Sequence, residues 1–115
     1  MYDEYAEVKE KYAAVIKDLL TKRFGDEIVF DPIVIRADPD AGPDPEFPSL
    51  WAYICYDGDD TKLDSDFRFE FTEELWPHSR QLGFPSVPVQ SFVPKANWPQ
   101  FWPGLKAWIE RRIPT

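Results

Sequence analysis

Carboxylates form the densest group of chemically versatile side chains in this sequence. Asp57, Asp59 and Asp60 stand in the stretch YDGDD, and two further aspartates, Asp64 and Asp66, follow closely. Carboxylate pairs at the end of a strand can hold Mg²⁺ for phosphoryl or nucleotidyl transfer, because this ion takes oxygen ligands. One hypothesis is therefore a metal-dependent phosphoryl- or nucleotide-handling enzyme that uses Asp57 and Asp59. The alternative interpretation is a solvated turn, since Asp and Gly are the usual turn residues.

Other familiar sets of catalytic and ligand-binding residues are incomplete. A zinc site built from Cys and His is excluded by count, because Cys55 and His78 are the only residues of these two types. The five glycines stand singly, and neither GxGxxG nor GxxxxGK[ST] occurs. An EF-hand loop beginning at Asp57 would carry Lys62 in place of its glycine and Arg68 in place of its bidentate glutamate. We therefore expect no cofactor.

A second unusual group of residues lies in the stretch PKANWPQFWPG, residues 94–104. Rigid aromatic side chains are enriched at binding hot spots, because they bury a large area at a small entropy cost. The candidate partner-binding residues are accordingly Lys95, Trp98, Phe101 and Trp102. A small domain must also bury some of its rings in order to fold. We therefore expect at least one of Trp98 and Trp102 to be clamped onto the core as a cover for the sheet, so that a surface role would rest on a ring left outside.

Prolines divide this same stretch. Pro99 is tolerable in a first helical turn, whereas Pro103 should interrupt a continuing helix. Residues that precede a proline are disfavoured in helical conformation, which applies to Trp98 and Trp102. The sequence therefore predicts a short turn over residues 98–102, followed by a new amphipathic helix over residues 103–112.

The periodicity of apolar residues defines the elements that must position these groups. Spacings of three and four residues over Asp3–Phe24, closed by Gly25, predict an N-terminal helix. The stretches EIVFDPIVIRA (27–37) and SLWAYICY (49–56) predict strands, the second of them covered on both faces. Pro32 indicates an edge position or a bulge. A proline-rich loop over residues 38–48 separates the two strands, and Cys55 is expected to be a buried, unreactive side chain.

The segment after residue 64 is ambiguous. Phe67, Phe69 and Phe71 alternate with charged residues, as in a strand over residues 66–71. The residues Phe67, Phe71 and Leu75 also fit one face of a helix that runs from about Ser65 to Leu82 and bends at Pro77. A further strand is predicted over residues 87–93 in either case.

These elements predict an α+β fold for the whole chain, residues 1–115, as one domain. We expect two layers: a short, mostly antiparallel sheet of three or four strands, with an N-terminal, a central and a C-terminal helix packed on it. A chain of 115 residues that is 43% hydrophobic can form a core without disulfides or structural metal.

The charge is unevenly distributed. The net charge is −8, and residues 26–74 hold fifteen acidic residues against three basic ones. This balance disfavours nucleic acid and favours a basic protein partner, or else serves only solubility. A single cysteine, the missing signal-peptide pattern and the missing apolar run of about 18–20 residues predict a cytoplasmic protein that does not bind membranes. Whether it is a monomer or a homodimer stays open.

Together these features favour a non-enzymatic protein-binding or regulatory module over the metal-dependent enzyme. The size and charge match the general profile of secretion chaperones, immunity proteins and antitoxins, although this match is one of profile only.

Overall fold

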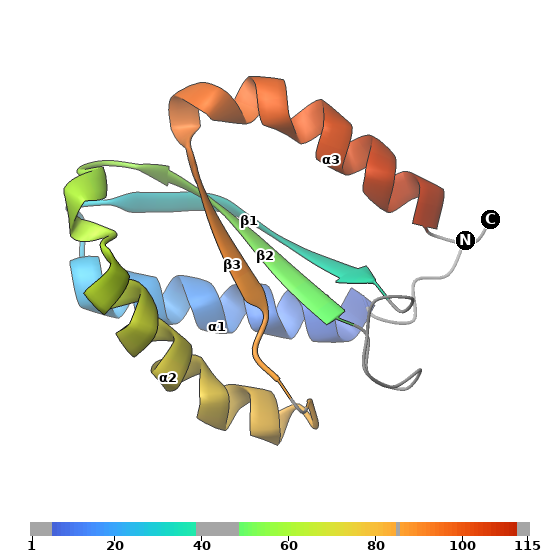
Figure 1. The fold of residues 1–115 in the computed structure, drawn as a ribbon, viewed down its shortest axis with the longest axis horizontal. Coiled ribbons are helices and arrows are strands. Elements are labelled where there is room, and N and C mark those ends of the chain that lie inside the picture. The colour runs from blue at the N-terminus through green and yellow to red at the C-terminus, as the bar shows by residue number, and fades with distance from the viewer. Residues whose placement is uncertain (1–5, 39–48, 85, 113–115) are drawn as a thin grey trace.

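The described residues, 6–38, 49–84 and 86–112, form three α-helices, two 3-10 helices and one three-stranded sheet (Figure 1). The structure is a computed structural model. The order of elements is α1 (Ala6–Phe24), β1 (Val29–Asp38), β2 (Ser49–Asp57), the 3-10 helix η2 (Asp60–Lys62), α2 (Ser65–Gln81), β3 (Val89–Pro94), the 3-10 helix η3 (Lys95–Asn97) and α3 (Trp98–Arg112). These residues form a single compact domain of helices and sheet, as the sequence predicts. The first residues of the predicted N-terminal helix and most of the 38–48 loop lie outside the described residues.

The sheet is mixed, with β2 in its centre. β1 pairs with β2 antiparallel, and β3 pairs with β2 in parallel, so the order is β1-β2-β3. The parallel pair arises because α2, which connects β2 to β3, brings the chain back to the end of the sheet at which β2 begins. Only one of the two strand pairs is therefore antiparallel, where the sequence predicts a mostly antiparallel sheet.

β1 lies at one edge of this sheet and contains an irregularity. Its register with β2 shifts between Phe30 and Ile33, the interval that holds Pro32. Proline lacks a backbone N–H and cannot donate to a neighbouring strand. The prediction of an edge position or a bulge at Pro32 is confirmed in both respects.

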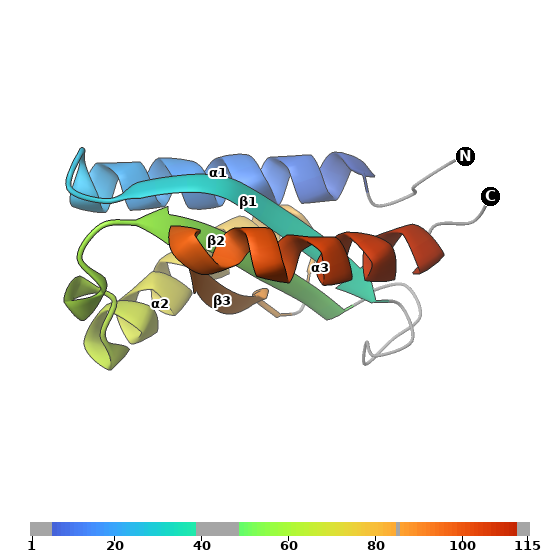
Figure 2. The same ribbon diagram turned by 90° about the horizontal axis from the view of Figure 1, so that it is seen from above.

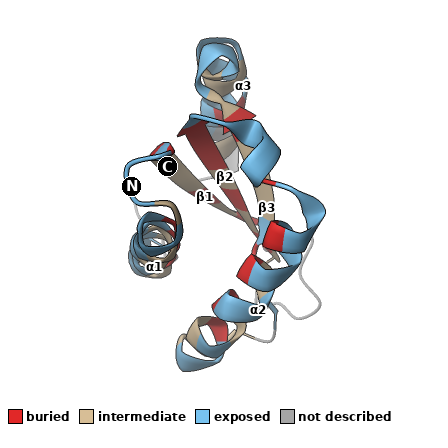
Figure 3. Cartoon of the chain, turned by 90° about the vertical axis from the view of Figure 1, so that its left-hand side faces the viewer, coloured by how far each residue is buried: buried red, intermediate tan, exposed pale blue. Residues whose placement is uncertain are grey.

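Helices cover both faces of the sheet. α1 and α2 lie on one face and α3 lies on the other, which makes three layers where two are expected (Figure 3). Seen from above, α3 passes over β1 and β2 (Figure 2). The physical reason is the composition of β2: Leu50, Ala52, Ile54 and Tyr56 belong to the core beneath the sheet, so the alternate residues Trp51, Tyr53 and Cys55 point to the α3 side.

α1 buries one stripe against the sheet. Tyr12, Ile16 and Leu20 follow at four-residue spacing, and each is fully buried. The helix ends at Phe24, after which Gly25 takes a left-handed φ of 58°, a conformation that glycine adopts without strain. The predicted end of this helix is confirmed.

The ambiguous segment is a helix, so the strand over residues 66–71 is wrong. Phe67 and Phe71 are buried, whereas Phe69 is 68% exposed, as helical spacing requires. Asp64 caps the start of the helix, because its carboxylate accepts a hydrogen bond of 2.8 Å from the backbone N–H of Phe67. Pro77 lies within α2 and does not end it.

α3 runs without interruption from Trp98 to Arg112, so the predicted break at Pro103 is wrong. Trp98 has helical angles, φ −59° and ψ −44°, although a proline follows it. The fixed φ of proline is itself helical, and Pro103 removes one hydrogen bond, that to the carbonyl of Pro99 near the helix start. Packing of the α3 rings against the sheet offsets this loss.

A buried hydrogen bond joins α1 to α2. The Tyr12 hydroxyl donates to Oγ of Ser79 over 2.7 Å, and both residues are 0% exposed. Burial raises the pKa of the Tyr12 hydroxyl above its ordinary value, so the group stays protonated and able to donate. The hydrogen bond between the two hydroxyls thus replaces bonds to water that both groups lose on burial.

We expect Ser79→Ala to lower the free energy of unfolding by about 1–3 kcal/mol, because the buried Tyr12 hydroxyl loses its partner. Tyr12→Phe should be destabilising as well, and the double variant should lose less than the sum of the two single changes. Urea unfolding of all four proteins measures this difference. Additive losses would show that the two hydroxyls contribute independently.

Candidate protein-binding surface

Three aromatic residues of α3 and one of β2 form a continuous group, here called the aromatic surface: Tyr53, Trp98, Phe101 and Trp102. The Trp98 and Trp102 rings are stacked, with centroids 5.7 Å apart and planes at 13°. This arrangement follows from their spacing, since residues i and i+4 lie on one side of a helix. Phe101 contacts Trp98 at 5.6 Å and Tyr53 at 5.4 Å. The structure therefore brings together three of the four predicted partner-binding residues.

None of these four rings is fully buried. Each lies partly exposed, and among the described side chains of α3 only Leu105, which is 7% exposed, is buried. Trp98 and Trp102 pack against each other, while Phe101 is the residue of the surface that reaches β2. The expectation that Trp98 or Trp102 covers the core is wrong, because the helix turns its Phe and Leu positions toward the sheet.

Lys95, the fourth predicted residue, lies in η3 just before α3 begins. Its Nζ is 3.8 Å from Oδ2 of Asp57, and both side chains are exposed. Because β2 and β3 are parallel, their carboxyl ends meet at one end of the sheet. The structure thus pairs one residue of the predicted binding site with one residue of the predicted metal site.

Asp59, the other carboxylate of the metal hypothesis, caps η2. It accepts hydrogen bonds from the backbone N–H and the hydroxyl of Thr61, at 3.0 Å and 2.6 Å. These two bonds stabilise the carboxylate and lower the pKa of Asp59 below its ordinary value. Within the described ranges, no three His, Cys, Asp or Glu side chains converge on one point where a metal ion would sit. The cap supports the turn interpretation, and the metal hypothesis remains a prediction.

Part of the acidic middle segment is paired with bases from other elements. Arg23 at the end of α1 forms ion pairs with Glu70 and Glu74 of α2, and Lys62 of η2 pairs with Glu27. The hydrogen bond from Lys62 to Glu27 raises the pKa of Lys62. These pairs are solvent-exposed, so each contributes little stability.

Cys55 is buried, being 2% exposed, as the sequence predicts. It lies on the strand face that α3 covers. Burial raises the pKa of its thiol, which keeps the group protonated and unreactive at neutral pH.

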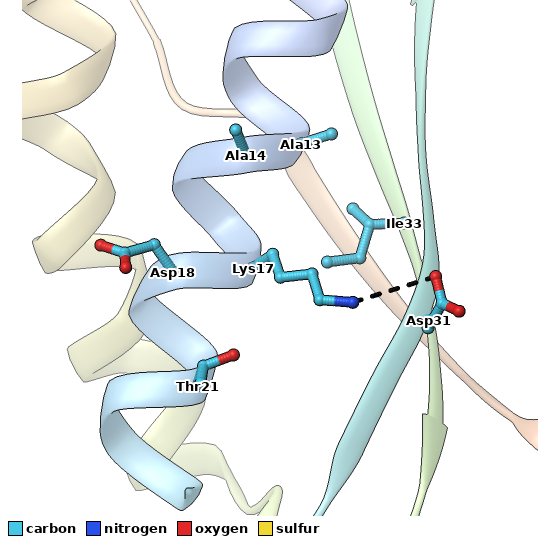
Figure 4. Close-up of a pocket in the computed structure, with 7 residues that line it drawn as sticks. All are labelled: Ala13, Ala14, Lys17, Asp18, Thr21, Asp31 and Ile33. Atoms are coloured by element: carbon cyan, nitrogen blue, oxygen red, sulfur yellow. Dashed lines mark ion pairs between the residues drawn. The ribbon is translucent and has the colours of Figure 1, made fainter.

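An open groove lies between α1 and β1 (Figure 4). Its volume is about 540 Å³, and the short side chains of Ala13 and Ala14 on α1 leave this space. Nζ of Lys17 reaches across it to Oδ1 of Asp31 at 3.9 Å. Lys17 and Asp31 are thus paired with each other across the groove. We therefore do not assign a binding or catalytic role to this groove.

Sequence reasoning missed Arg36. The guanidinium carbon, Cζ, lies 4.2 Å from the ring centroid of Trp51 and 4.1 Å from that of Trp108. One signal was available, because Arg36 is the only charged residue in the run IVIRA of a largely apolar strand. The rings that contact it belong to β2 and α3. Because these contacts form only in the folded protein, no local sequence pattern predicts them.

Comparisons with protein-family models, with curated proteins and with solved structures find no match for this chain. Among the described residues, no helix combines the length and the apolar composition needed to cross a lipid bilayer.

Proposed function

We propose that this protein is a non-enzymatic protein-binding module whose partner contacts the aromatic surface. The observation that carries this proposal is the continuity of four partly exposed rings, Tyr53, Trp98, Phe101 and Trp102. Each ring keeps part of its surface accessible, and contiguous apolar surface of this kind on a soluble domain can serve as an interaction site. Tryptophan and tyrosine are also the residues that contribute most to binding energy at protein interfaces.

The charge of the chain supports a basic partner. The acidic residues of segment 26–74 create a negative field, which raises the rate of encounter with a positively charged protein. Lys95 is positioned beside Asp57 at the start of α3, and it adds a polar edge to the aromatic surface. The single, buried cysteine supports a reducing, cytoplasmic location as part of the proposal.

The double variant Trp98→Ala/Trp102→Ala should lose at least about 30-fold in affinity, because two hot-spot rings contribute about 2 kcal/mol or more. The measurement is affinity capture of the native partner from lysate, followed by binding titrations with that purified partner. Raising the salt concentration should slow association, since steering by charge is screened.

Trp76→Ala is the matched control. Trp76 is also a partly exposed tryptophan on a helix, but it lies on α2 beneath the opposite face of the sheet, where Arg80 stacks on its ring at 5.8 Å. Circular dichroism of each variant serves to check that it is folded. Equal capture by the double variant and the wild type, or no stoichiometric partner at any salt concentration, would contradict the proposal.

A further inference from the structure

Arg36 is enclosed by aromatic rings on the α3 face of the sheet. Trp51 approaches its guanidinium from the sheet, and Trp108 approaches it from the helix, with centroids 4.2 Å and 4.1 Å from Cζ. Tyr53 adds a third ring at 5.6 Å. Cation–π contacts of this kind stabilise a guanidinium whose faces have lost water. Both indole rings thus lie close to the centre of the guanidinium group.

The charge of Arg36 has no anionic partner within the described part of the chain. None of the ion pairs formed there involves Arg36. Its Nε–H is buried and finds no acceptor. Ring faces interact with the cation as a whole and offer no oxygen acceptor to an N–H donor such as Nε. A buried donor without an acceptor is uncommon in folded proteins.

Arg68 shows how the same chain treats another stacked arginine. Its Cζ lies 5.3 Å from the ring centroid of Phe92, and its Nε donates to the carbonyl of Leu63 over 3.2 Å. A stacked arginine in this protein can therefore find an acceptor from its own backbone. Arg36 differs because its buried Nε–H has no such acceptor.

We propose that Arg36 binds a carboxylate group of a ligand between the walls formed by Trp51 and Trp108. Arg36 as a whole is only partly buried while its Nε is buried, so the proposal places the ligand at Nη1 and Nη2. A carboxylate is planar, and its two oxygens accept two parallel N–H bonds in the plane of the guanidinium. A tetrahedral phosphate cannot lie flat in the same slot. The ligand group is an acidic side chain or the terminal carboxylate of a peptide.

This inference goes beyond the proposed function and does not depend on it. Tyr53 belongs to the aromatic surface and also contacts Arg36, so a partner on that surface has a carboxylate site at its border. A partner can place one carboxylate there whatever its net charge. Because a small carboxylate can be tested without any protein partner, failure of one proposal leaves the other intact.

The test is a titration of the ¹⁵N-labelled protein with sodium acetate, with sodium chloride at equal ionic strength as the reference. We expect the Nε–Hε resonance of Arg36 to shift and to saturate at millimolar acetate, while that of Arg68 stays constant. Arg36→Gln should abolish binding, and Arg68→Gln should leave it unchanged. The wild-type titration decides the question even if an Arg36 variant is unfolded.

Two short peptides then separate the sources of the carboxylate. Acetylated Gly-Gly-Glu with an amidated end carries only the side-chain group, and acetylated Gly-Gly-Gly with a free end carries only the terminal group. Saturable binding of either peptide at Arg36 supports the proposal, and the tighter one identifies the source. No saturable shift beyond the chloride reference, equal shifts at Arg68, or tighter binding of inorganic phosphate than of acetate would overturn it.

Discussion

Phe71→Ala should lower the free energy of unfolding by about 3–5 kcal/mol, whereas Phe69→Ala should change it by no more than about 0.5 kcal/mol. The two residues lie two positions apart on α2. Phe71 is 1% exposed and stacks on Phe67 with centroids 5.6 Å apart, so its removal leaves a cavity in the core. Phe69 is 68% exposed and leaves no cavity. Urea unfolding followed by circular dichroism gives both values.

This pair of variants also tests the helix against the strand interpretation of residues 66–71. In a strand, Phe67, Phe69 and Phe71 would share one face and would lose comparable stability on truncation. Phe67→Ala serves as the positive control, because Phe67 is buried and also contacts Phe24 and Phe92. A loss at Phe69 as large as that at Phe71 would contradict the helix.

Gly58→Ala should lower the free energy of unfolding by at least about 3 kcal/mol, since it combines backbone strain with overpacking. Gly58 follows β2 with a φ of 154°. A Cβ atom there would lie 2.8 Å from the carbonyl oxygen of Glu27 and 2.9 Å from Cγ1 of Ile28. Ile28 belongs to the buried core and Glu27 contributes backbone, so neither neighbour can easily move aside. Thermal and urea unfolding both report the loss.

Gly83→Ala is the matched control for this change. Gly83 also has a positive φ, 82°, but a Cβ atom there would meet nothing within 4 Å. Its replacement should therefore show the conformational penalty alone, about 1–2 kcal/mol. Equal losses at the two glycines would mean that the chain around Glu27 moves to accept the methyl group.

Elements with one consistent periodicity could be predicted from the sequence. α1 repeats apolar residues at helical spacing and ends at Gly25, and β2 is apolar at nearly every position, so both were placed within a few residues of their observed bounds. The segment around Phe69 satisfied two periodicities at once. The cap at Asp64 decides between them, because a carboxylate three residues before the N–H it accepts is typical of a helix start.

The remaining differences come from tertiary contacts. The α3 helix passes through Pro103 because packing of Phe101 and Leu105 on the sheet outweighs a local preference. The candidate binding residues Trp98, Phe101 and Trp102 could be found from composition, since they are close in the sequence. Arg36 could not, because its ring contacts join strand residues to a helix far along the chain.

The covering of the sheet on two faces has a consequence for synthesis on the ribosome. α1 precedes all three strands in the chain, and α2 precedes β3, so the lower core can close as the strands emerge. The helix that covers the other face follows the last strand. Until residues 98–112 have left the exit tunnel, α3 cannot cover Trp51, Tyr53 and Cys55. During this interval the nascent chain exposes these three side chains to solvent.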